Sequence, residues 1–217
     1  MNSILFFKKY FDVFKAIIVL TVVCLVISGA LAVTNSITKD KIAEMERASA
    51  TAAMEALIPN GEYTKTDLSN IKEIENADIY TVSKGGTTVG YIVTTAAKGY
   101  GGDVKVMTAI SSDKKVIGVN ILSAADETPG LGQNATKPDF YNQFKNKTSG
   151  VTVVKNGAEN NEINAVTGAT ITSRAVTTAV NEALSQLDTY LNSITIPEIE
   201  TDVSPEEILG TEVQYEE

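Results

Sequence analysis

The hydrophobic pattern of the chain begins with a long apolar run near the amino terminus. Residues 16–38 contain no charged side chain, and isoleucine, valine and leucine dominate them. As an α-helix this run would rise about 34 Å, which is enough to cross a hydrocarbon core of roughly 30 Å. The pattern therefore predicts a single transmembrane helix over residues 16–38, preceded by a short tail over residues 1–15.

A cleaved signal peptide is the alternative interpretation of this run, because Ala30-Leu31-Ala32 resembles a cleavage site behind an apolar segment. The preceding tail favours a retained anchor instead, since it is long for the amino-terminal region of a signal peptide and is rich in aromatic residues of the kind found at membrane–water interfaces. These aromatic residues are Phe6, Phe7, Tyr10, Phe11 and Phe14.

The charges that flank the run predict its orientation only weakly. Three basic residues precede it, Lys8, Lys9 and Lys15, and an equal number follow it, Lys39, Lys41 and Arg47. Size is the stronger argument, because a very short tail stays in the cytoplasm easily and a long domain is translocated largely regardless of its charge. We expect a single-pass protein of the cell membrane with a cytoplasmic amino terminus and an extracytoplasmic carboxy-terminal domain.

Small and apolar residues recur at helical spacing behind the run, and Pro59-Asn60-Gly61 ends the pattern. This predicts a helical stalk over residues 39–60 that continues from the membrane. Two pairs of alternating, β-branched runs follow, and each pair flanks a turn signal. The runs are residues 79–82 and 89–93 around Gly85-Gly86, and residues 104–110 and 116–122 around Ser112-Asp113-Lys114.

Beyond these two predicted hairpins the pattern becomes mixed. A short helix is expected from Pro138, with Thr136 as its N-cap and with Phe140 and Phe144 on its buried face. Residues 151–154 are typical of a short strand. The domain over residues 61–195 is therefore expected to be α+β, with a mainly antiparallel sheet and flanking helices behind the single transmembrane helix.

The clearest helical pattern is the last one, an apolar stripe that starts directly after Thr172-Ser173 and is closed by Pro197. The stripe consists of Val176, Val180, Leu184, Leu187 and Leu191. The segment over residues 196–217 carries many acidic residues and no basic one, so it is expected to be a disordered, solvated tail.

Composition excludes several classes of chemistry. The formal net charge of -9 disfavours a nucleic acid partner, which requires clustered basic residues. The chain has no histidine, which removes Ser-His-Asp and Cys-His catalysis, and Cys24 is its only cysteine, so no disulfide framework and no cysteine-bound cluster is expected. We expect no metal site and no catalytic acid or base, and any redox chemistry would need a bound organic cofactor.

Thr167-Gly168-Ala169-Thr170 leads into the last predicted helix, followed by Ile171-Thr172-Ser173. The amides of a helix's first turn and the helix dipole favour an anion such as phosphate at this position. The simpler interpretation is N-capping, in which Thr170 or Thr172 bonds the next amides. Spacing alone favours the capping interpretation.

Three stretches together resemble one family, the FMN-binding domains of Rnf and Na⁺-translocating quinone reductase complexes. Thr167 to Thr170 resembles the [ST]-G-A-T flavinylation motif, Gly99 to Gly102 resembles a G-Y-G-G segment, and residues 127–132 resemble an E-T-P-G-L-G loop. By itself Thr128-Pro129-Gly130 would simply be a turn. The resemblance covers residues 1 to about 191, and the short length favours the Rnf G subunit over the C subunit of the quinone reductase.

The resemblance implies that FMN is attached covalently, by a phosphoester to the hydroxyl of Thr170. The same motif places Thr167, Gly168, Ala169 and Thr172 beside the attached group. The loop residues Glu127, Thr128, Leu131 and Gly132, together with Tyr100 and Gly101 of the glycine-rich segment, are then expected to lie around the flavin.

Two positions qualify the resemblance. The family usually has Asp three residues before the motif, where this chain has Asn164, and a flavin transferase that reads the carboxylate would act more slowly here. Arg174 could pair with the phosphate, although a solvated arginine in the first turn is the better expectation.

The implied function is an electron-relay subunit of a translocase that couples electron flow between ferredoxin and NAD to Na⁺ or H⁺ transport. Its implied partners are the other membrane subunits of the Rnf complex and, during maturation, a flavin transferase. A stand-alone extracytoplasmic flavoprotein and a flavin-free adhesion or sensor domain are the alternatives. Co-purifying subunits would distinguish the first alternative, and the absorption spectrum would distinguish the second.

Overall fold

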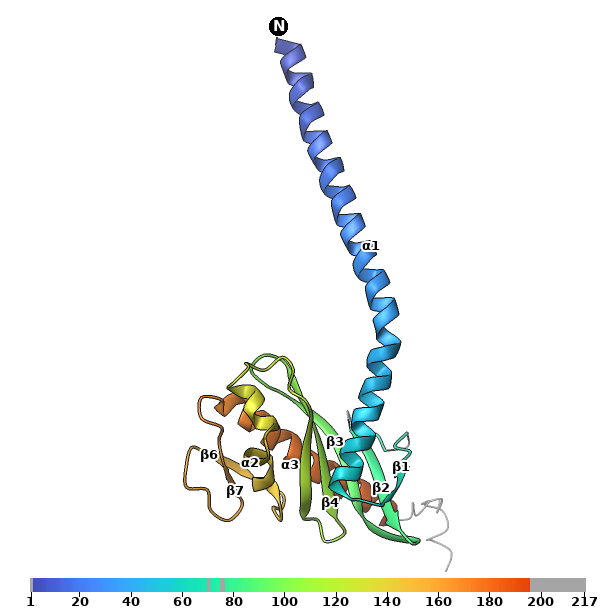
Figure 1. The fold of residues 1–217 in the computed structure, drawn as a ribbon, viewed down its shortest axis with the longest axis vertical. Coiled ribbons are helices and arrows are strands. Elements are labelled where there is room, and N and C mark those ends of the chain that lie inside the picture. Colours follow the sequence, from blue (N-terminus) through green and yellow to red (C-terminus); the bar gives the residue numbers. More distant parts are fainter. Residues whose placement is uncertain (1, 70, 75–76, 196–217) are drawn as a thin grey trace, which may run out of the picture. The chain divides into compact units, whose positions relative to one another are not determined.

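The computed structural model describes residues 2–69, 71–74 and 77–195, which fall into two units, one up to Ala52 and one from Ala53 onward. The first unit is the greater part of α1 (Asn2–Leu57), a single uninterrupted helix (Figure 1). The side chains described from Phe14 to Ile37 are exposed, and by length and composition Ile17–Leu57 qualifies as a helix able to cross a membrane. The predicted stalk is thus helical and continues directly from the apolar run.

The end of α1 is fixed by its own residues. Asn60 has a φ of 57°, a left-handed conformation that stops the helix, and its amide donates to Glu55 Oε1 at 2.9 Å. The Tyr63 hydroxyl donates to the Ile58 carbonyl at 2.7 Å. The bond from Tyr63 satisfies a carbonyl of the kind that a helix leaves without a partner at its carboxy-terminal end.

The second unit is built on a five-stranded antiparallel sheet in the order β1-β2-β3-β4-β5 (Figure 1). Both predicted hairpins are confirmed, and the φ values of 57° and 81° at Gly85 and Gly86 are those that a tight two-residue hairpin turn requires. The first strand was missed by the sequence prediction because it is short and mostly exposed. The strands are β1 (Glu62–Lys65), β2 (Asp78–Lys84), β3 (Thr87–Lys98), β4 (Asp103–Ser111) and β5 (Val116–Ser123).

Short elements and one long helix complete the unit. They are the 3-10 helix η1 (Gly132–Thr136), α2 (Pro138–Tyr141), the 3-10 helix η2 (Asn142–Phe144), the parallel pair β6 (Thr152–Val154) and β7 (Glu162–Asn164), and α3 (Thr170–Thr195). This architecture is the expected α+β fold with a mainly antiparallel sheet.

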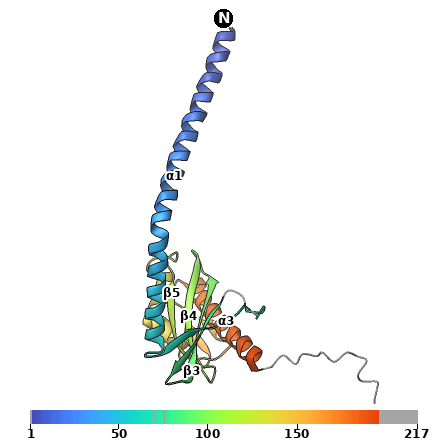
Figure 2. The ribbon, with the colours of Figure 1, turned by 90° about the vertical axis from the view of Figure 1, so that its right-hand side faces the viewer.

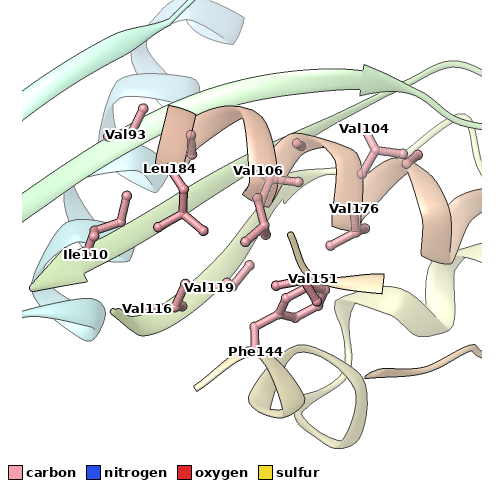
Figure 3. Close-up of a cluster of buried hydrophobic side chains, with 14 of the residues drawn as sticks. Val93, Val104, Val106, Ile110, Val116, Val119, Phe144, Val151, Val176 and Leu184 are labelled. Atoms are coloured by element: carbon pink, nitrogen blue, oxygen red, sulfur yellow. The ribbon is translucent and has the colours of Figure 1, made fainter. Parts of the chain in front are cut away.

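The main core lies between the sheet and α3, which packs along one face of β3 and β4 (Figure 2). Val104 and Val106 of β4 face Val176 and Leu184 of α3 in this core (Figure 3). The same cluster includes Phe144, which is fully buried. On the opposite face of the sheet, buried Ile92, Met107 and Ala109 form a second apolar layer, and Leu57 at the end of α1 packs against Gly118 of β5.

The structure corrects three of the sequence predictions. The last helix begins at Thr170, four residues before the start expected directly after Ser173. Thr136 does not cap α2, because its hydroxyl donates to the Gln133 carbonyl, and Lys137 occupies the cap position in the extended conformation that a following proline imposes. The strand β7 was not predicted, since three residues are too few to show a strand pattern in the sequence. Pro197 and the acidic tail lie outside the described residues.

Candidate functional site

Three segments that are far apart in the sequence converge on one cavity of about 560 Å³. They are the glycine-rich turn between β3 and β4, the loop that follows β5, and the first turn of α3. The cavity is lined by Tyr100, Glu127, Thr128, Leu131, Gly132, Gly168, Ala169, Thr170, Ile171 and Thr172. Apart from Thr167 and Gly101, every residue proposed for the site from the sequence lies in this lining.

The start of α3 is held in place without a threonine cap. The Ala169 carbonyl accepts a bond from the Ser173 amide at 3.0 Å, which makes Ala169 the cap residue. The Ser173 hydroxyl donates to the same carbonyl and accepts from the Val166 amide, each at 2.9 Å. Gly168 enters the helix with a φ of 76°, a left-handed conformation that glycine adopts without strain. The capping interpretation of Thr170 and Thr172 is therefore wrong.

The three threonines of the motif differ in their surroundings. Thr172 is 1 % exposed, and its hydroxyl donates to Glu127 Oε2 at 2.5 Å. Thr170 is half-buried at the cavity wall, and within the described part of the chain its hydroxyl has no hydrogen-bond partner. Thr167 is exposed and lies outside this cavity. Of these three residues, Thr170 is the one that both lines the cavity and has a hydroxyl without a hydrogen-bond partner among the described residues.

Glu127 links the three segments. Its side chain is only 2 % exposed, and its Oε1 accepts from the Tyr100 amide at 2.8 Å and from the Gly101 amide at 3.2 Å. Its Oε2 accepts from Thr172 on α3. Gly101, although outside the lining, thus belongs to the site through Glu127.

The loop after β5 contains the turn expected from its sequence. The Leu131 amide donates to the Thr128 carbonyl at 3.1 Å, and Gly130 in the third position has a φ of 76°, which is the geometry of a type II turn. This turn places Leu131, 43 % exposed, at the cavity wall. Tyr100, 71 % exposed, and Ile171, 53 % exposed, are the other large side chains of the lining. The mouth of the cavity is thus apolar.

Ile171 and Lys155 were missed by sequence reasoning. Ile171 would have been found if the helix had been started at Thr170, because its first turn borders the cavity. Lys155 lines a second hollow of about 310 Å³, which shares Gly168 and Thr170 with the cavity and also contains Thr167. No sequence pattern links Lys155 to the motif.

Two further positions have structural explanations. Arg174 is exposed and lines neither of these two hollows, in keeping with a solvated arginine. Asn164 Oδ1 accepts from the Ala158 amide at 3.1 Å, and the Asn164 amide donates to Gln143 Oε1 at 2.8 Å. An aspartate at position 164 could accept the same bond from Ala158, so the local fold accommodates either residue.

Two regions of the chain match known protein families. A family model described as the RnfG N-terminal region matches residues 13–57, and one described as the FMN-binding domain matches residues 99–185. The chain is 38% identical over 172 residues to the G subunit of the proton-translocating ferredoxin:NAD(+) oxidoreductase complex of Clostridium ljungdahlii, covering 79% of this chain and 89% of the relative. It is 36% identical over 188 residues to the G subunit of the Na(+)-translocating complex of Acetobacterium woodii, covering 79% and 90%.

A solved structure has the same fold. The crystal structure of Shewanella oneidensis NqrC superposes with a TM-score of 0.50 at 25% identity, covering 62% of this chain and 69% of that protein.

Proposed function

The chain belongs to the family of G subunits of Rnf-type ion-translocating ferredoxin:NAD⁺ oxidoreductase complexes, and we propose that it carries FMN as a phosphoester on Thr170. The FMN-binding domain makes it a flavoprotein subunit of an oxidoreductase and translocase, with the other Rnf subunits as its partners. The single observation that carries the proposed attachment is the free hydroxyl of Thr170 at the wall of the shared cavity.

The residues of the cavity fit FMN. A volume of about 560 Å³ lies within the range of roughly 300–1,000 Å³ typical of cofactor and small-molecule sites. The side chains of Leu131, Ile171 and Tyr100 offer an apolar surface for a flat ring system. The small residues Gly168 and Ala169 leave room for a bulky group next to the backbone.

The first turn of α3 supports a phosphate on Thr170. Its amides have no partners within the helix, and Ala169 has no side-chain acceptor to offer them. The helix dipole adds about 0.3–1 kcal/mol in favour of an anion at this end. Attachment would form a bond from Thr170 Oγ1 to phosphorus while the bond from that phosphorus to the leaving group of an activated FMN donor breaks, and the hydroxyl proton would be lost. We propose a flavin transferase as the enzyme that binds this donor and releases its leaving group.

Flavin supplies the electron chemistry when it is bound, and the chain's own residues position it. Thr170 would fix the phosphate end, and Leu131, which the type II turn holds at the cavity wall, would contact the ring. Among the residues that line the cavity, none is required as a catalytic acid or base. The open, apolar mouth leaves an edge of the site accessible to a neighbouring redox subunit.

We propose that α1 anchors the protein in the membrane through residues 16–38, as a single span with a cytoplasmic amino terminus. The helix is long and apolar enough, and its described side chains in this stretch are exposed rather than packed in a core. The FMN-binding domain would then lie outside the cytoplasm.

The attachment is tested by in-gel fluorescence of the full-length protein after denaturation, co-expressed with its flavin transferase. Thr170→Ala should abolish the fluorescent band, because no other hydroxyl of the motif is free at the cavity wall. Thr167→Ser should retain it. Fluorescence that persists in Thr170→Ala and disappears in Thr172→Ala would place the attachment on Thr172 and refute the proposal.

A further inference from the structure

The Glu127 carboxylate is buried in an unusual way for a charged group. It is 2 % exposed, and the ion pairs found among the described residues do not include it. The hydrogen bonds that Glu127 would make to water are replaced by bonds from the backbone amides of Tyr100 and Gly101 and from the Thr172 hydroxyl. The distance from Thr172 Oγ1 to Glu127 Oε2 is 2.5 Å.

The glycines of the site make room for this carboxylate. A Cβ on Gly99 would collide with Glu127 Oε1, and a Cβ on Gly132 would collide with Oε2. A Cβ on Gly101 would collide with the carbonyl oxygen of Asp126, the residue just before Glu127. The glycine-rich turn and the loop after β5 are therefore shaped around Glu127, which positions both of them against α3.

A glutamine could make these hydrogen bonds without burying a charge. Its amide oxygen could accept from the two backbone amides, and its amide nitrogen could donate to the Thr172 hydroxyl, which can rotate to accept. Burying a carboxylate is more costly than burying an amide. Glu127 lines the cavity, so its charge would act on a group bound there. A fixed negative charge opposes the addition of electrons to a group held beside it.

We propose that Glu127 is a positioning residue that ties the three segments of the site together and that its negative charge lowers the reduction potential of the flavin. The second part of this inference rests on the proposed function. The first part concerns the protein alone and is independent of the cofactor.

Two substitutions separate the charge from the hydrogen bonds. Glu127→Gln removes the charge and retains the bonding pattern, whereas Thr172→Val retains the charge and removes one bond at nearly constant volume. Glu127→Ala removes both. The full-length protein is purified in detergent after co-expression with the transferase, its thermal unfolding is recorded, and the potential of its flavin-loaded fraction is titrated spectroelectrochemically.

We expect Glu127→Gln to shift the midpoint potential to more positive values while the unfolding temperature stays that of the wild type. Thr172→Val should unfold earlier, by about 5 °C, without a positive shift of the potential. Glu127→Ala should show both effects.

An unchanged potential in Glu127→Gln would overturn the role of the charge, and an unchanged unfolding temperature in Glu127→Ala would overturn the positioning role. A wild-type protein without covalent flavin would instead refute the proposed function and the role of the charge with it. The unfolding measurements on the same samples would still decide the positioning role.

Discussion

At the scale of single residues, two constraints disfavour a side chain at Gly168. Its φ of 76° is left-handed, and a Cβ there would lie 3.0 Å from Leu131 Cδ2. Gly157 has the same φ of 76° but nothing within 4 Å of its Cβ position. The two glycines therefore share the backbone strain and differ in the crowding of the site.

This pair yields a matched prediction. Gly168→Ala and Gly157→Ala should each lower the free energy of unfolding by about 1–2 kcal/mol, the cost of a left-handed alanine. Only Gly168→Ala should also reduce covalent flavin, because it displaces Leu131. Chemical denaturation and in-gel fluorescence measure the two quantities. Equal flavin loading in both variants would show that the Gly168–Leu131 contact does not shape the site.

At the scale of elements, the packing of α3 on the sheet includes both a satisfied and an unsatisfied buried hydroxyl. Thr95 of β3 donates to the Ala179 carbonyl of α3 at 2.8 Å. Thr108 of β4 is fully buried, and its hydroxyl has no partner among the described residues. The same substitution should therefore have opposite effects at these two positions.

Thr95→Val should destabilise the domain by about 1 kcal/mol, since it removes a buried hydrogen bond between sheet and helix. Thr108→Val should be neutral or stabilising, because a methyl group replaces a hydroxyl that is buried without a partner. The shift of the urea midpoint in each variant checks the prediction. A loss of stability in Thr108→Val would mean that its hydroxyl is bonded in solution.

At the scale of the whole molecule, the testable question is on which side of the membrane the FMN-binding domain lies. The amino-terminal tail before the apolar run is short, whereas the part of the chain behind it is long. A long domain can be translocated regardless of charge, and a short tail is easily left inside. We expect protease added to cells without an outer barrier to remove the flavin domain and to leave an amino-terminal tag protected. Protection of the carboxy-terminal domain would reverse the orientation.

Local patterns were enough to predict much of the fold. The apolar run, the two hairpins and the helical stripe from Val176 each carry their signal within a few consecutive turns or strand residues, so a sequence suffices to find them. The start of α3 was misplaced because Thr172-Ser173 looks like a cap. In the structure Thr172 is inside the helix, and its hydroxyl is used by Glu127, 45 residues away in the sequence.

The sequence by itself thus determined the family, the longer elements and the residue types of the site, because these depend on periodicity, turn chemistry and short motifs. Only the tertiary structure decided which hydroxyl is free and which is engaged. That distinction depends on the burial of Thr172 against Glu127 and on the exposure of Thr170 at the cavity wall. Both follow from the approach of three distant segments, and no spacing along the chain specifies that approach.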